Sequence, residues 1–234
     1  MSKGSTARQR VEAGLPRRRR KEFLFKLTGM LATTVGVVFL GVFFATLIAK
    51  GSSAFKQTFL QLDIEFSEDV LAPGGELDLQ YADFDGLVRS ALRAALPDVT
   101  DRRARRELNR IVSVGAGYQV RDMLIASPEL LGTTQTIWVP ASSNVDMLIK
   151  GKIDVTVAAQ RRPLSDRQIA WVQELQRDGL LELRFNRALF TNGDSREPEL
   201  AGIKGAMMGS MYMLTITLLL SFPIGVAAAI YLEE

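Results

Sequence analysis

The stretch Leu27–Ala49, which reads LTGMLATTVGVVFLGVFFATLIA, decides how the rest of the chain is interpreted. It contains no charged residue and is bounded by Lys26 and Lys50. A bilayer core about 30 Å thick needs roughly 20 helical residues, and the run lacks the polar stripe of a water-soluble core helix. We therefore expect a transmembrane helix at 27–49. The main alternative is a secretory signal, but its apolar region is only about 7–15 residues long and no good small-residue cleavage site follows.

A second uncharged run, Gly205–Leu232, reads GAMMGSMYMLTITLLLSFPIGVAAAIYL and predicts a second transmembrane helix at 205–232. Pro223 is expected to kink this helix because proline removes one helical hydrogen bond. Gly205 and Gly209 have the spacing that lets helix backbones approach closely in lipid. The final residues, 233–234, are expected to lie in the cytoplasm.

Basic side chains precede the first run and set the expected orientation. The residues closest to it are Arg17, Arg18, Arg19, Arg20, Lys21 and Lys26. Lys and Arg beside a span mark the cytoplasmic side of the membrane, so residues 1–26 are expected to be a basic cytoplasmic tail facing membrane lipids. Because the excess positive charge lies in this tail, directly beside a predicted span, it is interpreted as an orientation signal and a nucleic-acid partner is not expected.

The sequence predicts a membrane protein in which two transmembrane α-helices flank a mixed α/β extracytoplasmic domain, residues 50–190. Strands are predicted at 58–67, 134–141, 152–159 and 180–190, helices at 83–97, 101–113, 117–127, 142–151 and 163–179, and a turn at 71–78. Asp101 is an expected N-cap, and Ser165 with Gln168 forms a capping box. Residues 191–204 are expected to form an amphipathic helical elbow that continues into the second span; a plain linker is the alternative, but the helix-start signals favour the elbow.

The residue types exclude several classes of chemistry. The chain has neither Cys nor His, which excludes disulfides, thiolate chemistry and Cys-based zinc sites and removes the commonest general base and metal ligand. No Gly-rich phosphate loop is present, so ATP hydrolysis by this chain is not expected. We expect no catalytic residue, no cofactor and no metal site.

Three polar clusters are candidate anion sites, each with a simpler explanation. Ser142, Ser143 and Asn144 stand at a predicted helix start, where backbone N–H groups favour oxyanions, although ordinary capping explains them equally. Arg161 and Arg162 could clamp a phosphate or belong to a solvated loop. The third cluster comprises Arg102, Arg103, Arg105 and Arg106. It could attract an anion or an acidic partner, or form an ordinary charged helix face.

Residues 190–234, FTNGDSREPELAGIKGAMMGSMYMLTITLLLSFPIGVAAAIYLEE, resemble the start of the permease body in the PstA-type subunit of bacterial phosphate ABC transporters. The segments ELAGI, GSMYMLTIT and PIGVAAAIYLEE carry the resemblance, together with the upstream anchor. Some members of that family have an extra domain where residues 51–190 stand. The resemblance implies a multi-pass subunit of the bacterial inner membrane with a cytoplasmic N-terminus.

The same resemblance implies the partners: a second permease subunit, a cytoplasmic ATPase dimer that hydrolyses ATP, and a periplasmic phosphate-binding protein. Family members continue after YLEE with further spans and a loop that engages the ATPase. The chain is therefore expected to be an N-terminal fragment or truncated product that does not transport phosphate by itself.

A membrane receptor or sensor, with an extracytoplasmic ligand-binding domain between two spans, has the same layout. Pro223 and the small residues GVAAA favour a span packed among several others, as in a permease. Further apolar spans after residue 234 would support the permease, whereas a heptad-rich segment would support the receptor.

Overall fold

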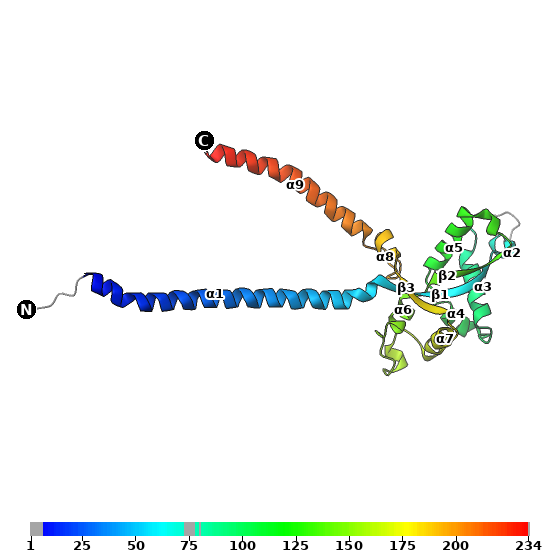
Figure 1. Ribbon diagram of the computed structural model, residues 1–234. Helices are drawn as coiled ribbons and strands as arrows, with labels where there is room; N and C mark the ends of the chain where they lie inside the picture. Colours follow the sequence, from blue (N-terminus) through cyan, green and yellow to red (C-terminus); the bar gives the residue numbers. More distant parts are fainter. Residues whose placement is uncertain (1–6, 73–77, 80, 234) are drawn as a thin grey trace, which may run out of the picture. The chain divides into compact units, whose positions relative to one another are not determined.

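The structure is a computed structural model that describes residues 7–72, 78–79 and 81–233, with side chains described from residue 20 onward (Figure 1). The chain divides into two compact units, Met1–Ser53 and Ala54–Glu234. Two long apolar helices, one near each end of the chain, flank a mixed α/β region with a small antiparallel sheet.

The described part of the first unit is the helix α1 (Ala7–Gly51) and the start of the short 3-10 helix η1 (Ser52–Phe55), which ends in the second unit. The helix predicted at 27–49 is therefore confirmed, but it begins much earlier and includes most of the residues expected to form a tail. Arg, Lys, Glu and Ala are good helix formers, so the basic segment extends the apolar helix.

The sheet of the second unit has three strands in the order β2-β1-β3, all antiparallel. The strands are β1 (Lys56–Glu65), β2 (Thr134–Pro140) and β3 (Leu181–Phe185). Alternate residues of β1, namely Leu60, Leu62 and Ile64, are buried, as expected when one face of a strand covers a core. Leu62 pairs with Ile137 and Leu60 with Leu181, so the register brings apolar partners to the same face.

Helices supply the other side of the core. They are α2 (Glu68–Leu71), α3 (Phe84–Ala95), α4 (Arg102–Leu108), α5 (Gly115–Ala126), η2 (Pro128–Leu130), α6 (Ser143–Ile149), η3 (Ala159–Arg161), α7 (Asp166–Arg177), α8 (Ala188–Thr191) and α9 (Lys204–Glu233). Helix α3 packs on β1 and on α5, and α5 packs on β2. The single core cluster includes Leu92, Leu108 and Val120 from three of these helices.

The predicted caps are confirmed where the sequence signals were strong. The Asp101 carboxylate accepts a hydrogen bond of 2.8 Å from the Ala104 backbone N–H at the start of α4. Ser165 Oγ accepts from the Gln168 N–H at 3.3 Å, and Gln168 Oε1 accepts from the Ser165 N–H at 3.0 Å, which completes the capping box of α7. Gly179 has a φ of 73°, which suits glycine, just after α7 ends.

The strand predicted at 152–159 is wrong, because this segment forms turns and the first residue of η3. Asp154 accepts hydrogen bonds from the backbone N–H of Thr156 at 2.9 Å and from its hydroxyl at 2.6 Å. Such side-chain bonds to the local backbone compete with strand pairing. Val155 and Val157 are exposed, so their alternation did not reflect a buried sheet face.

Two predictions near the second apolar helix also need correction. The strand predicted at 180–190 ends at Phe185, and α8 follows it. The helical elbow predicted at 191–204 is absent between α8 and α9 in the described chain. Instead the segment folds back on itself, with Asn192 Nδ2 donating to the Leu200 carbonyl at 2.9 Å and the Gly202 N–H donating to the Gly193 carbonyl at 2.7 Å.

The remaining predicted features are the turn and the kink. Most of the turn predicted at 71–78, residues 73–77, lies outside the described residues. Pro223 lies inside α9, which continues through it as one helix and is curved along its length (Figure 1).

Candidate functional site at the junction with the apolar helices

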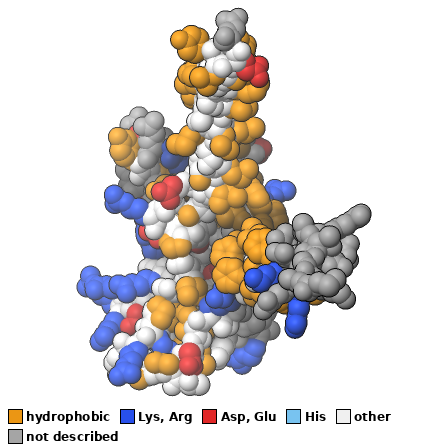
Figure 2. All heavy atoms as spheres, turned by 90° about the vertical axis from the view of Figure 1, so that its left-hand side faces the viewer, with side chains coloured by type: hydrophobic (Ala, Val, Ile, Leu, Met, Phe, Trp, Pro, Cys, Tyr) orange, Lys and Arg blue, Asp and Glu red, His pale blue; other side chains and the backbone are white. Residues whose placement is uncertain are grey.

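Among the described residues, two helices are long and apolar enough to cross a membrane, Arg20–Phe55 and Lys204–Glu233. None of their side chains is buried, and Figure 2 shows hydrophobic side chains along α9, the column that rises to the top of that view. Their hydroxyls bond inside the helix: Thr28 donates to the Leu24 carbonyl at 2.7 Å and Thr215 to the Met211 carbonyl at 2.8 Å. Intrahelical bonds of this kind satisfy polar groups where water is absent.

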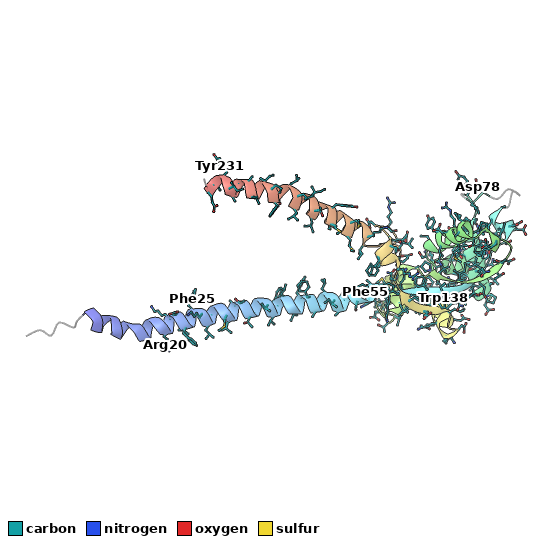
Figure 3. The ribbon with its side chains drawn as sticks, turned by 45° about the horizontal axis from the view of Figure 1, so that its top comes forward. Arg20, Phe25, Phe55, Asp78, Trp138 and Tyr231 are labelled. Atoms are coloured by element: carbon teal, nitrogen blue, oxygen red, sulfur yellow. The ribbon has the colours of Figure 1, made fainter. Side chains whose placement is uncertain are left out.

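The start of the first apolar helix combines basic and aromatic residues. Arg20, Lys21 and Lys26 are exposed, and Figure 3 labels Arg20 and Phe25 on the same part of α1. Lys26 pairs with Glu22 at 2.7 Å, an exposed pair that contributes little stability. The side chains of the other three predicted anchors, Arg17, Arg18 and Arg19, lie outside the described part of the structure.

The segment that leads into α9 is tied to the first strand of the domain. Asn186 donates its backbone N–H to the Phe55 carbonyl at 2.9 Å and its side-chain Nδ2 to the Ala54 carbonyl at 3.2 Å. The buried Gln57 donates Nε2 to the Glu199 carbonyl at 2.9 Å. These bonds hold the chain that enters the domain beside the chain that leaves it, and we call this region the junction, residues 54–57 with 185–204.

The backbone at the junction is closely packed. The Ile203 N–H donates to the Leu189 carbonyl at 2.7 Å, just before α9 begins. A Cβ added to Gly202 would lie 2.3 Å from the Asn192 carbonyl oxygen and 2.6 Å from that of Ala188. Because both of these atoms belong to the backbone, only glycine fits at position 202 without moving the chain.

Three phenylalanines complete the junction. The rings of Phe55 and Phe190 stack with centroids 6.0 Å apart, and those of Phe185 and Phe190 stack at 5.8 Å. Figure 3 labels Phe55 where the first apolar segment reaches the domain. These three residues were not predicted from the sequence, where their one signal is that Phe55 closely follows an apolar run.

The first predicted anion site, Ser142 with Ser143 and Asn144, lies at the start of α6 as expected. Ser142 occupies the N-cap position, but its hydroxyl makes no capping bond and Oγ is buried without a described partner. The first turn of α6 also contains Asp146, whose carboxylate accepts two 2.8 Å hydrogen bonds from the backbone N–H and the hydroxyl of Thr58. Asp146 also forms an ion pair with Lys150, which neutralises the nearby positive charge that an anion would use, and α6 is too short to add much dipole.

The second predicted site, Arg161 with Arg162, does not form a clamp. Arg162 forms an ion pair with Asp166 in the first turn of α7, while its side chain is almost fully buried. Arg161 lies in η3 and is exposed. The pairing of Arg162 neutralises the charge that a phosphate would use.

The arginines of α4 fit the reading as an ordinary helix face. Arg103 approaches Glu107 at 3.8 Å, and Arg105 Nε donates to the Val99 carbonyl at 3.1 Å. Glu107 also pairs with Arg167 at 2.8 Å, which links α4 to α7. No group of side chains suited to a metal ion occurs in the part of the chain that the structure describes.

Two carboxylates in the domain, those of Asp101 and Asp154, have a lowered pKa. The hydrogen bond from the Ala104 N–H is the main reason why the pKa of Asp101 lies below its ordinary value of 3.8. For Asp154, the hydroxyl and the N–H of Thr156 lower the pKa in the same way. Both groups stabilise local turns or caps, so these shifts indicate structural roles and not acid–base chemistry.

Comparison with known proteins gives one match. No curated protein and no solved structure matches the chain. Residues 12–159 match the family model described as a domain of unknown function, DUF3333. The matched region begins inside α1, includes β1 and β2, and ends at the first residue of η3. Because it spans more than half of the 234 residues, the chain belongs to the DUF3333 family.

Proposed function

We propose that the protein is the N-terminal part of an inner-membrane permease subunit of an ABC importer for inorganic phosphate. The observation that carries the proposal concerns α9, which forms most of the stretch that resembles a permease body. This helix has no charged residue between Lys204 and Glu233, and every described side chain on it is exposed. An apolar helix of this length is stable only when lipid or other apolar helices cover it. In this proposal α1 anchors the chain and α9 forms part of the translocation pathway.

The glycines of α9 support packing against further helices. No atom lies within 4 Å of where a Cβ would stand on Gly209 or Gly225, so both sites are open to a neighbour. Small residues at such positions let helix backbones approach closely, which is how helices associate in lipid. The neighbours would be the other spans of the permease and its partner permease subunit.

The domain has a mechanical role in this proposal. The hydrogen bond from Gln57 ties β1, and the one from Asn186 ties η1, to the segment that precedes α9. A phosphate-binding protein that contacts the domain from outside would therefore act on the first turn of α9 through the junction. ATP hydrolysis would belong to the cytoplasmic ATPase dimer.

The test is phosphate uptake in the native host. Deleting the gene should abolish high-affinity uptake of radiolabelled phosphate at limiting concentration, and the intact gene should restore it. Complementation with Gly209→Leu should restore less uptake, because the larger side chain blocks close helix packing. Met213→Leu on the same helix is the matched control and should restore it fully.

Normal uptake in the deletion strain would refute the proposal. If uptake persists but the cell loses its response to an external solute, the receptor alternative would replace the permease. Normal restoration by Gly209→Leu would remove the argument from helix packing while leaving the uptake result in place.

A further inference from the structure

An exposed stack of three aromatic rings lies at the junction. Phe190 lies between the other two, with ring planes 18° from Phe55 and 8° from Phe185. Their exposed fractions are 47% for Phe55, 60% for Phe185 and 44% for Phe190. We call these three residues the aromatic patch. Contiguous exposed apolar surface marks an interaction site in a folded protein.

The aromatic patch is separate from the hydrophobic core of the domain. None of the three phenylalanines belongs to the core cluster or to the half-buried side chains that pack against it. Leu183, two residues before Phe185 on β3, is also exposed and shares its face of the strand. The rings therefore contact one another while presenting their outer surfaces to whatever covers the junction.

The patch is linked along the chain to both apolar segments. Phe55 is the last residue of the apolar segment Arg20–Phe55. Phe190 lies in α8, and the neighbouring Leu189 accepts the hydrogen bond of Ile203, the residue just before α9. The patch is thus continuous along the chain with the two segments that are apolar enough to cross a membrane.

Charged residues near the patch fit a lipid surface. Lys56 follows Phe55, Arg187 lies between Phe185 and Phe190, and Lys204 begins α9; all three are exposed. Long basic side chains can bury their stems in apolar surroundings while their charged ends reach headgroup phosphates. Aromatic side chains are likewise enriched where spans leave the hydrocarbon core.

We propose that the aromatic patch inserts into the headgroup–acyl boundary of the bilayer, in the leaflet from which the two helices emerge into the domain. The occupant is lipid, and the insertion seats the α/β domain on the membrane at the junction. This inference rests on the membrane insertion that the proposed function includes, but not on phosphate as the substrate.

Site-directed spin labelling of the full chain directly tests whether the aromatic patch inserts into the bilayer. The sequence has no cysteine, so single substitutions give unique labelling sites. Nitroxides are placed at Phe185→Cys and Phe190→Cys in lipid nanodiscs of mixed neutral and anionic phospholipid. Collision with oxygen, which concentrates in lipid, is compared with collision with a water-soluble nickel chelate.

Two further positions serve as controls. Leu218→Cys, in the middle of α9, reports whether that helix is in lipid. Ile125→Cys, an exposed apolar site on α5, reports water. It lies about 15 Å along α5 from Gly115, the end of that helix that contacts Leu200 of the junction.

The proposal predicts an oxygen-to-nickel collision ratio at 185 and 190 several-fold above that at 125 and below that at 218. If the ratio at 185 and 190 equals that at 125 while position 218 is in lipid, the aromatic patch does not insert into the bilayer, although the helices still cross it. Low collision with both reagents would indicate a protein contact and also overturn the insertion. A low oxygen-to-nickel ratio at position 218 would show that α9 is in water, and it would refute both the insertion of the aromatic patch and the proposed function.

A second variant guards against disruption of the ring stack by cysteine. In a background in which Trp138 and Trp171 are replaced by phenylalanine, Phe190→Trp keeps an aromatic ring in the patch. Lipids brominated near the headgroup should quench its fluorescence strongly, and lipids brominated at the chain ends should quench it less. Equal and weak quenching by both lipids would contradict insertion.

Discussion

Leucine has opposite surroundings in the two kinds of region that make up this chain. Leu60 on β1 has no exposed surface, whereas Leu218 in the middle of α9 is 64% exposed. In the domain, apolar side chains alternate with polar ones and pack into a core. In α9, they cover the helix on all sides without a described neighbour. The domain is built to fold in water, and α9 requires another environment.

The largest expected effect comes from making the same substitution in both regions. Leu60→Ala should lower the free energy of unfolding of the domain by about 2–5 kcal/mol, because it leaves a cavity in the core. Leu218→Ala should leave it unchanged. Urea titration in detergent measures both, since the only two tryptophans of the chain, Trp138 and Trp171, lie in the domain. Equal effects would contradict the division into two regions.

The junction should resemble the domain and not the apolar helix in its response to added volume. Gly202→Ala places a methyl group against two backbone carbonyls and should destabilise the junction by about 1–3 kcal/mol. Gly209→Ala meets no atom within 4 Å and should be tolerated. Hydrogen exchange of the amides at 189–203 measures the change. Unaltered protection in Gly202→Ala would show that the junction is loosely packed.

Ser165 and Ser142 both occupy the N-cap position of a helix, but only the Ser165 side chain makes a capping hydrogen bond. Ser165→Ala removes a working N-cap and should cost about 1 kcal/mol. Ser142→Ala removes a buried hydroxyl that has no described partner, so it should be neutral or slightly stabilising. Thermal unfolding of the two variants tests this contrast. A larger loss for Ser142→Ala would indicate an interaction that the structure does not show.

Acid should affect the domain through Asp101 and Asp154. Because the folded-state pKa of each lies below 3.8, each contributes stability that is present above that value and lost as the pH falls through the folded pKa. The double variant Asp101→Asn, Asp154→Asn should therefore lose less stability than the parent in this acid range. Asp178→Asn serves as the control. Identical acid profiles would refute the assignment, and this is the smallest effect expected.

Sequence patterns predicted the parts of the fold that local physics determines. Uncharged runs identified both apolar helices, and side-chain chemistry identified the caps at Asp101 and Ser165. The alternation at 58–67 predicted a strand, which the structure has as β1 at Lys56–Glu65. Each of these features depends on residues that are neighbours along the chain, which is why a single sequence reveals them.

The features that were not predicted are those in which specific side-chain and backbone hydrogen bonds override a local pattern, or in which residues far apart in the chain meet. The alternation at 152–159 resembles a strand, but the Asp154 turn prevents pairing. The elbow predicted at 191–204 contains good helix-start residues, yet bonds from Asn192 and Gly202 fold the segment back. The aromatic patch joins residues far apart in sequence. Arg162 looked available to a ligand because the sequence does not show that its side chain is buried, although the i,i+4 spacing to Asp166 is local.

Thiol labelling in spheroplasts tests most directly whether the helices cross a membrane and hold the domain outside. Asp178→Cys, an exposed site after α7, should react with a membrane-impermeant reagent added to intact spheroplasts. Leu218→Cys should resist the same reagent before and after lysis. Reaction of position 178 only after lysis, or ready reaction of position 218 from the water phase, would contradict this arrangement.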